Sequence, residues 1–165
     1  AGLPLSTEAA APKAATFPVE PSAASIMVDK SVVLDTIDDK SAVLLDVRDV
    51  DEWIGESSSP YGRDFCPRKG RLPGAVWLEW YRMMKPGPAG PLMKSREELL
   101  AECATVGVGP DTPVILYCFK GARASNTFLA LKEAGINDVR MYFGSWNEWS
   151  RDPSLPIESG LPFAA

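Results

Sequence analysis

Short apolar runs alternate with stretches whose apolar positions recur every three or four residues, and this alternation extends over residues 26–158. A short apolar run between turn residues predicts a buried strand, whereas the longer period predicts an amphipathic helix. Strands that alternate with helices are typical of a parallel sheet covered on both faces. We therefore expect an α/β fold with a doubly wound, parallel, five-stranded sheet and helices on both faces.

The individual elements follow from the same pattern. Strands are expected at 26–28, 42–45, 75–77, 114–117 and 139–142. Helices are expected after an Asp29 cap, as a single turn at 49–54, as a short segment at 79–84, from a Ser95 capping box to Gly107, and at 124–134. Residues 55–71 form a long loop, residues 86–91 a surface connection, and residues 144–149 pack aromatic rings over a sheet edge.

The chain divides into three parts. Residues 1–25 are rich in Ala, Pro, Ser and Thr and predict a flexible linker or extended arm. Residues 26–158 are long enough for one domain with a real core, and residues 159–165 form a tail. Because the chain begins with Ala1 and no apolar signal segment follows, we expect a processed protein or a piece of a longer one.

Composition removes several classes of function. The net charge of -5 argues against nucleic acid or an anionic membrane as the main partner, and no apolar stretch reaches a membrane-spanning length. The chain has no histidine, which excludes Cys–His nucleophilic pairs and histidine metal ligands. Its three cysteines, Cys66, Cys103 and Cys118, lack metal-binding spacing, so we expect no metal, no cofactor and no disulfide framework.

The strongest candidate for chemistry is Cys118, which directly follows the apolar run 114–117. Lys120 and Arg123 lie within the next five residues, and a helical pattern follows them. A helix N-terminus favours an anion, and a cysteine beside cations reacts as the thiolate. Cys118 is therefore interpreted as a nucleophile, although a small buried residue at a strand end is the simpler alternative.

Four motifs occur in a known order along the chain, and together they resemble a rhodanese-like sulfurtransferase domain, in particular the C-terminal domain of tandem two-domain enzymes. The motifs are Leu45-Asp46-Val47-Arg48 with Glu52-Trp53, Gly70-Arg71-Leu72-Pro73-Gly74-Ala75, the segment from Tyr117 to Ala124, and Phe143-Gly144-Ser145-Trp146-Asn147-Glu148-Trp149. The opening Gly2-Leu3-Pro4 is similar to the linker of tandem enzymes, so an upstream rhodanese domain is a candidate partner.

The resemblance implies a sulfur transfer through a Cys118 persulfide. The thiolate would take the outer sulfur of thiosulfate, and cyanide, a thiol or another protein would then remove it. The backbone N–H groups from Phe119 through Gly121 and Ala122 to Ala124 would hold the persulfide and the donor. Lys120 and Arg123 would orient the departing sulfite.

Departures from the family pattern refine this interpretation. A basic residue at the position of Lys120 favours thiosulfate over 3-mercaptopyruvate, and Glu52 replaces an arginine that often binds the donor. Arg63 is a weak candidate substitute for that arginine, and Arg71 replaces a histidine with structural consequences only. Asp46 and Arg48 are expected to form a buried pair that supports the loop.

Two further points stay open at this level. Cys66 lies among cations and is expected to be exposed, where it would relay sulfur or pair with Cys118, although an incidental loop thiol is the simpler interpretation. Cys103 falls on an apolar helix face and is assigned to the core.

Three other functions and the compartment also stay open. A persulfide carrier with poor turnover is the main alternative, and an interaction module with an inactive loop is disfavoured because the cysteine is present. A Cys-loop phosphatase or arsenate reductase is disfavoured because only four residues separate Cys118 from Arg123. We favour a soluble, cytoplasmic protein over a periplasmic one, but the sequence does not identify the compartment.

Overall fold

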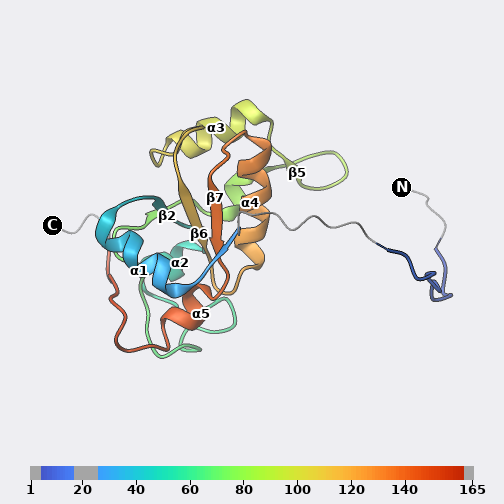
Figure 1. Cartoon of the computed structure of the whole chain (residues 1–165). Helices are drawn as coiled ribbons and strands as arrows, with labels where there is room; N and C mark the ends of the chain where they lie inside the picture. The colour runs from blue at the N-terminus through green and yellow to red at the C-terminus, as the bar shows by residue number, and fades with distance from the viewer. Residues whose placement is uncertain (1–4, 17–25, 162–165) are drawn as a thin grey trace.

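A parallel sheet forms the middle layer of the computed structural model, which describes residues 5–16 and 26–161 (Figure 1). Its five strands lie in the order β1-β7-β6-β2-β3, and every neighbouring pair is parallel. The strands are β1 Met27–Val28, β2 Val43–Asp46, β3 Val76–Trp77, β6 Val114–Tyr117 and β7 Val139–Tyr142. The expected α/β fold is confirmed.

The central strand β6 explains why the core has two halves. All four of its residues are buried, as expected for a parallel strand that is covered on both faces. Val114 and Leu116 belong to one apolar cluster, whereas Ile115 and Tyr117 belong to the other. This alternation follows the two-residue period of a strand and places one cluster on each face of the sheet.

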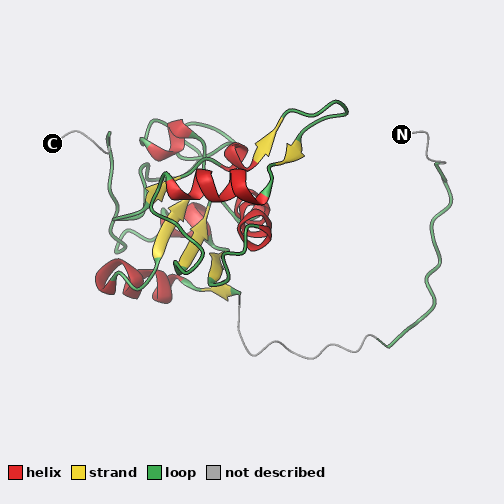
Figure 2. Ribbon diagram, turned by 90° about the horizontal axis from the view of Figure 1, so that it is seen from above, coloured by secondary structure: helices red, strands yellow, loops and turns green. Residues whose placement is uncertain are grey.

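Helices cover both faces (Figures 1 and 2). One cluster includes residues of α3 (Arg96–Ala104), α4 (Ala122–Glu133) and the 3-10 helix η1 (Trp80–Met83). The other cluster includes residues of α1 (Lys30–Asp39) and α5 (Ser145–Trp149). A single turn, α2 (Val50–Trp53), follows β2. The two helix layers leave the carboxyl ends of the strands and their following loops at one edge of the sheet.

Two helix starts form as their sequences indicate. The Asp29 carboxylate accepts hydrogen bonds from the backbone N–H groups of Ser31 and Val32 at the start of α1. The Ser95 hydroxyl accepts from the N–H of Glu98, whose carboxylate accepts from the N–H of Ser95 in return. Both caps satisfy N–H groups that a helix leaves unpaired at its first turn.

Three elements differ from the expected pattern. Helix α4 begins at Ala122, two residues before the expected start, so Arg123 lies in its first turn. Residues 86–91 connect the antiparallel strands β4 (Met84–Lys85) and β5 (Leu92–Met93), a hairpin that projects from the body in Figure 2. Residues 145–149 form α5, whose Trp146 and Trp149 are fully buried. The hairpin strands and α5 were missed because two- and five-residue elements are too short to show a period.

The ends of the chain are only partly described. Residues 5–16 are exposed and have no regular secondary structure. The Gly2-Leu3-Pro4 motif and the rest of 1–4, together with 17–25 and 162–165, lie outside the described residues, so the division at 25 and the tail at 159–165 stay predictions. In the part that is described, no helix is long and apolar enough to cross a membrane.

Candidate functional site

Cys118 lies at the carboxyl end of β6, and its loop leads directly into α4. The residue is 1% exposed, and its Sγ accepts a hydrogen bond of 3.1 Å from the backbone N–H of Gly121. Gly121 has a φ of 95°, and a Cβ at this position would lie 2.7 Å from the ring of Phe143. The turn therefore needs glycine both for its backbone conformation and for space. It brings an N–H group of the helix start onto the sulfur.

Helix α5 holds the backbone of this loop in place. The Ser145 hydroxyl accepts a hydrogen bond from the N–H of Cys118 and donates one to the carbonyl of Tyr142, at 3.2 and 2.8 Å. The N–H groups of Trp146 and Asn147 donate to the carbonyls of Cys118 and Phe119. Ser145 itself has a φ of 52°, a conformation that few non-glycine residues adopt. Sequence reasoning missed Ser145, since no period or motif connects it with Cys118.

The expected pair of Asp46 and Arg48 is present and fully buried. The Arg48 Nε lies 2.9 Å from Asp46 Oδ1, and its Nη2 lies 2.5 Å from Oδ2 and 2.8 Å from the carbonyl oxygen of Gly70. The Tyr117 hydroxyl donates to Asp46 Oδ2 and accepts from the N–H of Leu72. Burial alone would lower the pKa of Arg48, but the carboxylate of Asp46 raises it, so the guanidinium stays charged. This network joins the end of β6 to residues 70–72.

Arg123 is engaged by two carboxylates. Its Nη1 and Nη2 lie 2.6 and 3.1 Å from the two oxygens of Glu52, and Nη1 lies 3.1 Å from Asp49 Oδ2. Burial would lower the pKa of Arg123, but the hydrogen bonds and charge of Glu52 raise it. Glu52, which the sequence presents as a departure from the family pattern, is thus the buried partner of this guanidinium. Donor binding by Arg123 stays a prediction.

Lys120 extends toward solvent from the same loop. Its Nζ lies 4.7 Å from the centre of the Tyr61 ring, within the range of a cation–π contact. Among the described residues, no carboxylate forms an ion pair with Lys120, whereas two pair with Arg123. Lys120 is therefore the exposed cation of the loop.

A pocket of about 250 Å³ opens beside the sulfur. Four of its lining residues are aromatic, and its charged residues are Asp49, Lys120 and Arg123. The pocket is lined by Asp49, Pro60, Tyr61, Trp80, Tyr81, Cys118, Phe119, Lys120, Ala122 and Arg123. Its volume suits a small molecule or the end of a longer one.

Cys66 is not exposed, and that expectation is wrong. The residue is 4% exposed because the loop at 55–71 folds inward, with the N–H of Cys66 bound to the Ser58 hydroxyl. Its Sγ lies 3.7 Å from an Arg151 guanidinium nitrogen and 3.9 Å from Asn147 Oδ1. Cys66 and Cys118 are both free thiols, so the structure contains no disulfide between them.

The other residues that the sequence singled out contact their own surroundings rather than Cys118. Arg71 is buried, forms an ion pair with Glu158 and donates to the carbonyl of Gly160. The guanidinium of Arg63 donates to the carbonyl of Glu56, and a role in donor binding stays a prediction. Cys103 is fully buried, as expected, and burial raises its pKa to about 11.

One group of described residues has the spacing of a metal site. Carboxylate oxygens of Asp49, Asp51 and Glu52 lie within 4.8 Å of one another. Two of the three already pair with Arg123, whose guanidinium supplies a positive charge to the group. An acidic group with its own internal cation is typical of an ion-pair network.

Comparison with known proteins agrees with this geometry. Residues 29–152 match the rhodanese-like domain family. The chain belongs to that family. The matched range of this rhodanese-like domain includes Cys118 and its loop. The α/β fold, with helices on both faces of the sheet, agrees with the expectation from sequence.

Curated relatives carry names from sulfur chemistry. The chain is 32% identical over 162 residues to a putative thiosulfate sulfurtransferase of Mycobacterium bovis, covering 96% of this chain and 57% of the relative. It is 29% identical over 159 residues to a thiosulfate sulfurtransferase of Azotobacter vinelandii, with 94% and 54% covered. The sulfur carrier protein TtuD of Thermus thermophilus is 31% identical, with 96% and 57% covered. The chain thus spans about half the length of these relatives.

Solved structures give the same picture. A variant of EanB that carries a cysteine persulfide together with ergothioneine superposes with a TM-score of 0.77 at 28% identity. The match covers 92% of this chain and 37% of that chain. A cysteine persulfide is therefore found in a protein with this fold.

Proposed function

We propose that this domain transfers the outer sulfur of thiosulfate to a thiophilic acceptor, either cyanide or a thiol, through a persulfide on Cys118. The observation that carries the proposal is the bond from the Gly121 N–H to the Cys118 sulfur where α4 begins. An N–H donor directed at the sulfur would stabilise negative charge on it during the reaction, and the mechanism requires no histidine base. The names of the relatives support sulfur transfer as the type of reaction.

The first half-reaction loads the cysteine. The Cys118 thiolate attacks the outer sulfur of thiosulfate, a new S–S bond forms, and the S–S bond of thiosulfate breaks. Sulfite leaves with the electron pair, and the cysteine persulfide keeps one negative charge. Charge is conserved, with three negative charges before and after the step.

The second half-reaction removes the outer sulfur from Cys118. An acceptor thiolate or cyanide attacks the outer sulfur of the persulfide, and Cys118 leaves as the thiolate. The N–H groups of the loop from Phe119 to Ala124 would stabilise the negative charge on either sulfur. Lys120 would attract the dianionic donor, and Arg123, held by Glu52, would act mainly by keeping the first turn of α4 in place.

Intact mass measurement tests the proposal. After incubation with thiosulfate, the protein is expected to gain one sulfur atom, and the Cys118→Ser variant is expected to gain none. Cys66→Ser and Cys103→Ser serve as matched controls that are expected to keep the gain, because both of these thiols are buried and neither lines the pocket beside Cys118. No gain in the unaltered protein with any sulfane donor would refute a sulfurtransferase, and hydrolysis of an aryl phosphate would support the phosphatase alternative.

A sulfur carrier is the second candidate, because the relative from Thermus thermophilus bears that name. A carrier would load Cys118 as above but release sulfur slowly to cyanide and quickly to a partner. Steady-state thiocyanate formation separates the two: rapid turnover supports the enzyme, whereas one slow turnover per persulfide supports the carrier. Since the relatives are longer, a rhodanese domain on the same polypeptide is a candidate partner.

A further inference from the structure

One wall of the pocket beside Cys118 presents a negative charge to solvent. The side chain of Asp49 is 36% exposed, whereas its partner Arg123 is 13% exposed and Glu52 is 1% exposed. The guanidinium is therefore largely covered, so on this wall a molecule that enters the pocket meets the side chain of Asp49, while Lys120 is the exposed cation of the same pocket. Asp49 Oδ1 is also a buried oxygen without a hydrogen-bond partner.

Glu79 lies next to this wall, because it directly precedes η1 and the pocket residue Trp80. Burial together with the charge of Asp49 raises its pKa, while Arg123 and Arg82 oppose that shift. On the wall itself, the carboxylates of Asp49 and Glu52 both pair with the guanidinium of Arg123, so two negative charges meet one positive charge. This side of the pocket therefore favours a positively charged group.

Aromatic rings form the rest of the pocket wall. Trp80 and Tyr81 lie with ring centres 4.1 Å apart, and Tyr61 meets Phe119 edge to face at 5.5 Å. The Lys120 ammonium already lies over the face of Tyr61. Rings of this kind bind cations through their electron-rich faces, most strongly when the cation loses part of its water.

We propose that the physiological acceptor is a small aminothiol, a thiol that carries a protonated amine, and that its ammonium group binds between Asp49 and the rings of Trp80 and Tyr81. The proposal rests on the persulfide mechanism above. It adds the chemical class of the second substrate. The loop N–H groups and Lys120 would bind the dianionic donor. The negative charge of Asp49 would bind the ammonium of the acceptor.

The transfer step balances with this acceptor. The aminothiol thiolate forms a bond to the outer sulfur of the Cys118 persulfide, and the bond between that sulfur and Cys118 Sγ breaks. Cys118 leaves as the thiolate, and the acceptor leaves as a persulfide with its ammonium unchanged. No further oxidant or reductant takes part.

Single-turnover unloading tests the proposal. Protein loaded with thiosulfate and freed of donor is mixed with cysteamine, 2-mercaptoethanol or 3-mercaptopropionate, which are cationic, neutral and anionic. Loss of the extra sulfur is followed by intact mass, and each rate constant is referred to the thiolate concentration, since reactivity follows the thiolate. The rate constant is expected to be highest for cysteamine, lower for 2-mercaptoethanol and lowest for 3-mercaptopropionate. Added salt should reduce these differences.

Variants isolate the carboxylates from the intrinsic reactivity of each thiol. In Asp49→Asn and in Glu79→Gln, the ratio of the cysteamine rate to the 3-mercaptopropionate rate is expected to fall about two- to fivefold, the range for one partly exposed charge pair. Trp80→Leu should lower the cysteamine rate alone. Glu133→Gln, which removes an exposed carboxylate near the other end of α4, is the matched control and should leave the ratio unchanged.

The outcomes separate this inference from the function on which it rests. If no persulfide forms, the proposed function fails before the acceptor is tested. If the persulfide forms but the three thiolates react equally, or the anionic thiol reacts fastest, the aminothiol proposal is overturned and the sulfurtransferase stands. An unchanged ratio in Asp49→Asn and Glu79→Gln overturns it as well.

Discussion

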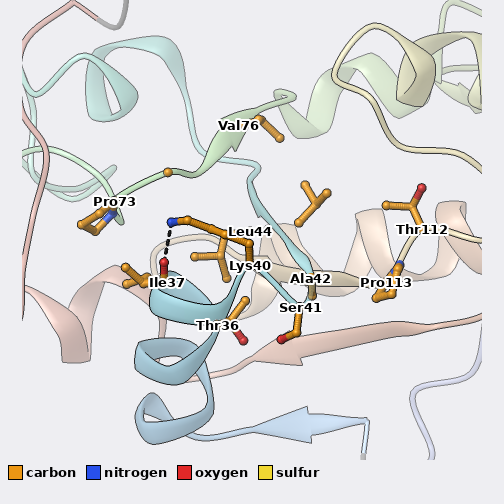
Figure 3. A pocket seen from close by; sticks show the side chains of 12 residues that line it. Thr36, Ile37, Lys40, Ser41, Ala42, Leu44, Pro73, Val76, Thr112 and Pro113 are labelled. Atoms are coloured by element: carbon orange, nitrogen blue, oxygen red, sulfur yellow. Dashed lines mark hydrogen bonds between the residues drawn. The ribbon is translucent and has the colours of Figure 1, made fainter.

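The two ends of the central strands each open onto a pocket, and the two pockets differ in chemistry more than in size. At the carboxyl ends, about 250 Å³ lies beside Cys118. At the amino ends of β2 and β6, about 320 Å³ lies between the end of α1, Pro73 and Pro113 (Figure 3). The larger pocket contains no thiol and no carboxylate among its described lining residues.

Helix direction explains the difference. Helix α4 begins at the carboxyl end, so an N–H group is available to the sulfur of Cys118. Helix α1 ends at the amino-end pocket, and the last turn of a helix presents carbonyl groups that have no partner within the helix. Lys40, in a left-handed conformation with a φ of 57°, turns its ammonium back onto the carbonyl of Ile37 (Figure 3). The cation is therefore used to complete the helix end. The direction of the flanking helix, rather than the volume of the pocket, decides which end can stabilise an anion.

Replacing the buried cation Arg48 at one end and the exposed cation Lys40 at the other gives the largest expected contrast. Arg48→Met leaves the buried Asp46 carboxylate without its cation, bonded only by the Tyr117 hydroxyl and the backbone N–H of residue 48, so the free energy of unfolding should fall by about 3–5 kcal/mol. Lys40→Met should cost no more than about 1 kcal/mol, because its ammonium reaches solvent. Urea denaturation measures both. Equal losses would show that the two ends are supported alike.

Removing the hydroxyl of Ser145 tests how tightly the reactive end is positioned. Ser145→Ala leaves the buried N–H of Cys118 without its acceptor, which should lower the free energy of unfolding by about 1–3 kcal/mol. The maximum rate of persulfide formation should fall at least about tenfold while half-saturation by thiosulfate stays similar.

Two matched variants show whether that loss is specific. Ser150→Ala at the other end of α5 removes a buried hydroxyl without a partner and should cost nothing. Ser145→Gly relieves the left-handed backbone but still lacks the hydroxyl, so it should recover stability without recovering the rate. A full rate in Ser145→Ala would contradict a positioning role.

A pair of glycines gives a small expected effect on stability and a clear separation of the two ends. Gly121 and Gly74 have φ values of 95° and 72°, so alanine at either position should cost about 1–2 kcal/mol. A Cβ at 121 would also meet the Phe143 ring at 2.7 Å, whereas at 74 it meets only the flexible end of Lys40 at 3.3 Å.

Sulfur loading should therefore fall in Gly121→Ala and stay unchanged in Gly74→Ala. Thermal unfolding and intact mass after thiosulfate give the two measurements. Normal loading in Gly121→Ala would show that the N–H bond to the sulfur does not depend on this turn.

Local pattern was enough for the parts of the molecule that are close in sequence. The strands, the caps at Asp29 and Ser95, and the succession of strand, cysteine and helix at 114–124 all follow from side-chain period and charge within a few residues. Asp46 and Arg48 are two residues apart, so their pairing was predictable as well. Membership of the family was likewise visible in four short motifs, and the match over 29–152 confirms it.

Only the tertiary structure decided which distant groups meet. Arg123 and Glu52 are 71 residues apart, and Cys118 and Ser145 are 27 apart. No pattern within either segment carries information about its partner, because such contacts depend on how the chain crosses between strands. The burial of Cys66 has the same cause, since the loop at 55–71 is folded inward by contacts with Ser58, Asn147 and Arg151. Cys118 could be predicted as a candidate nucleophile from local sequence, whereas the charge around it arose from packing.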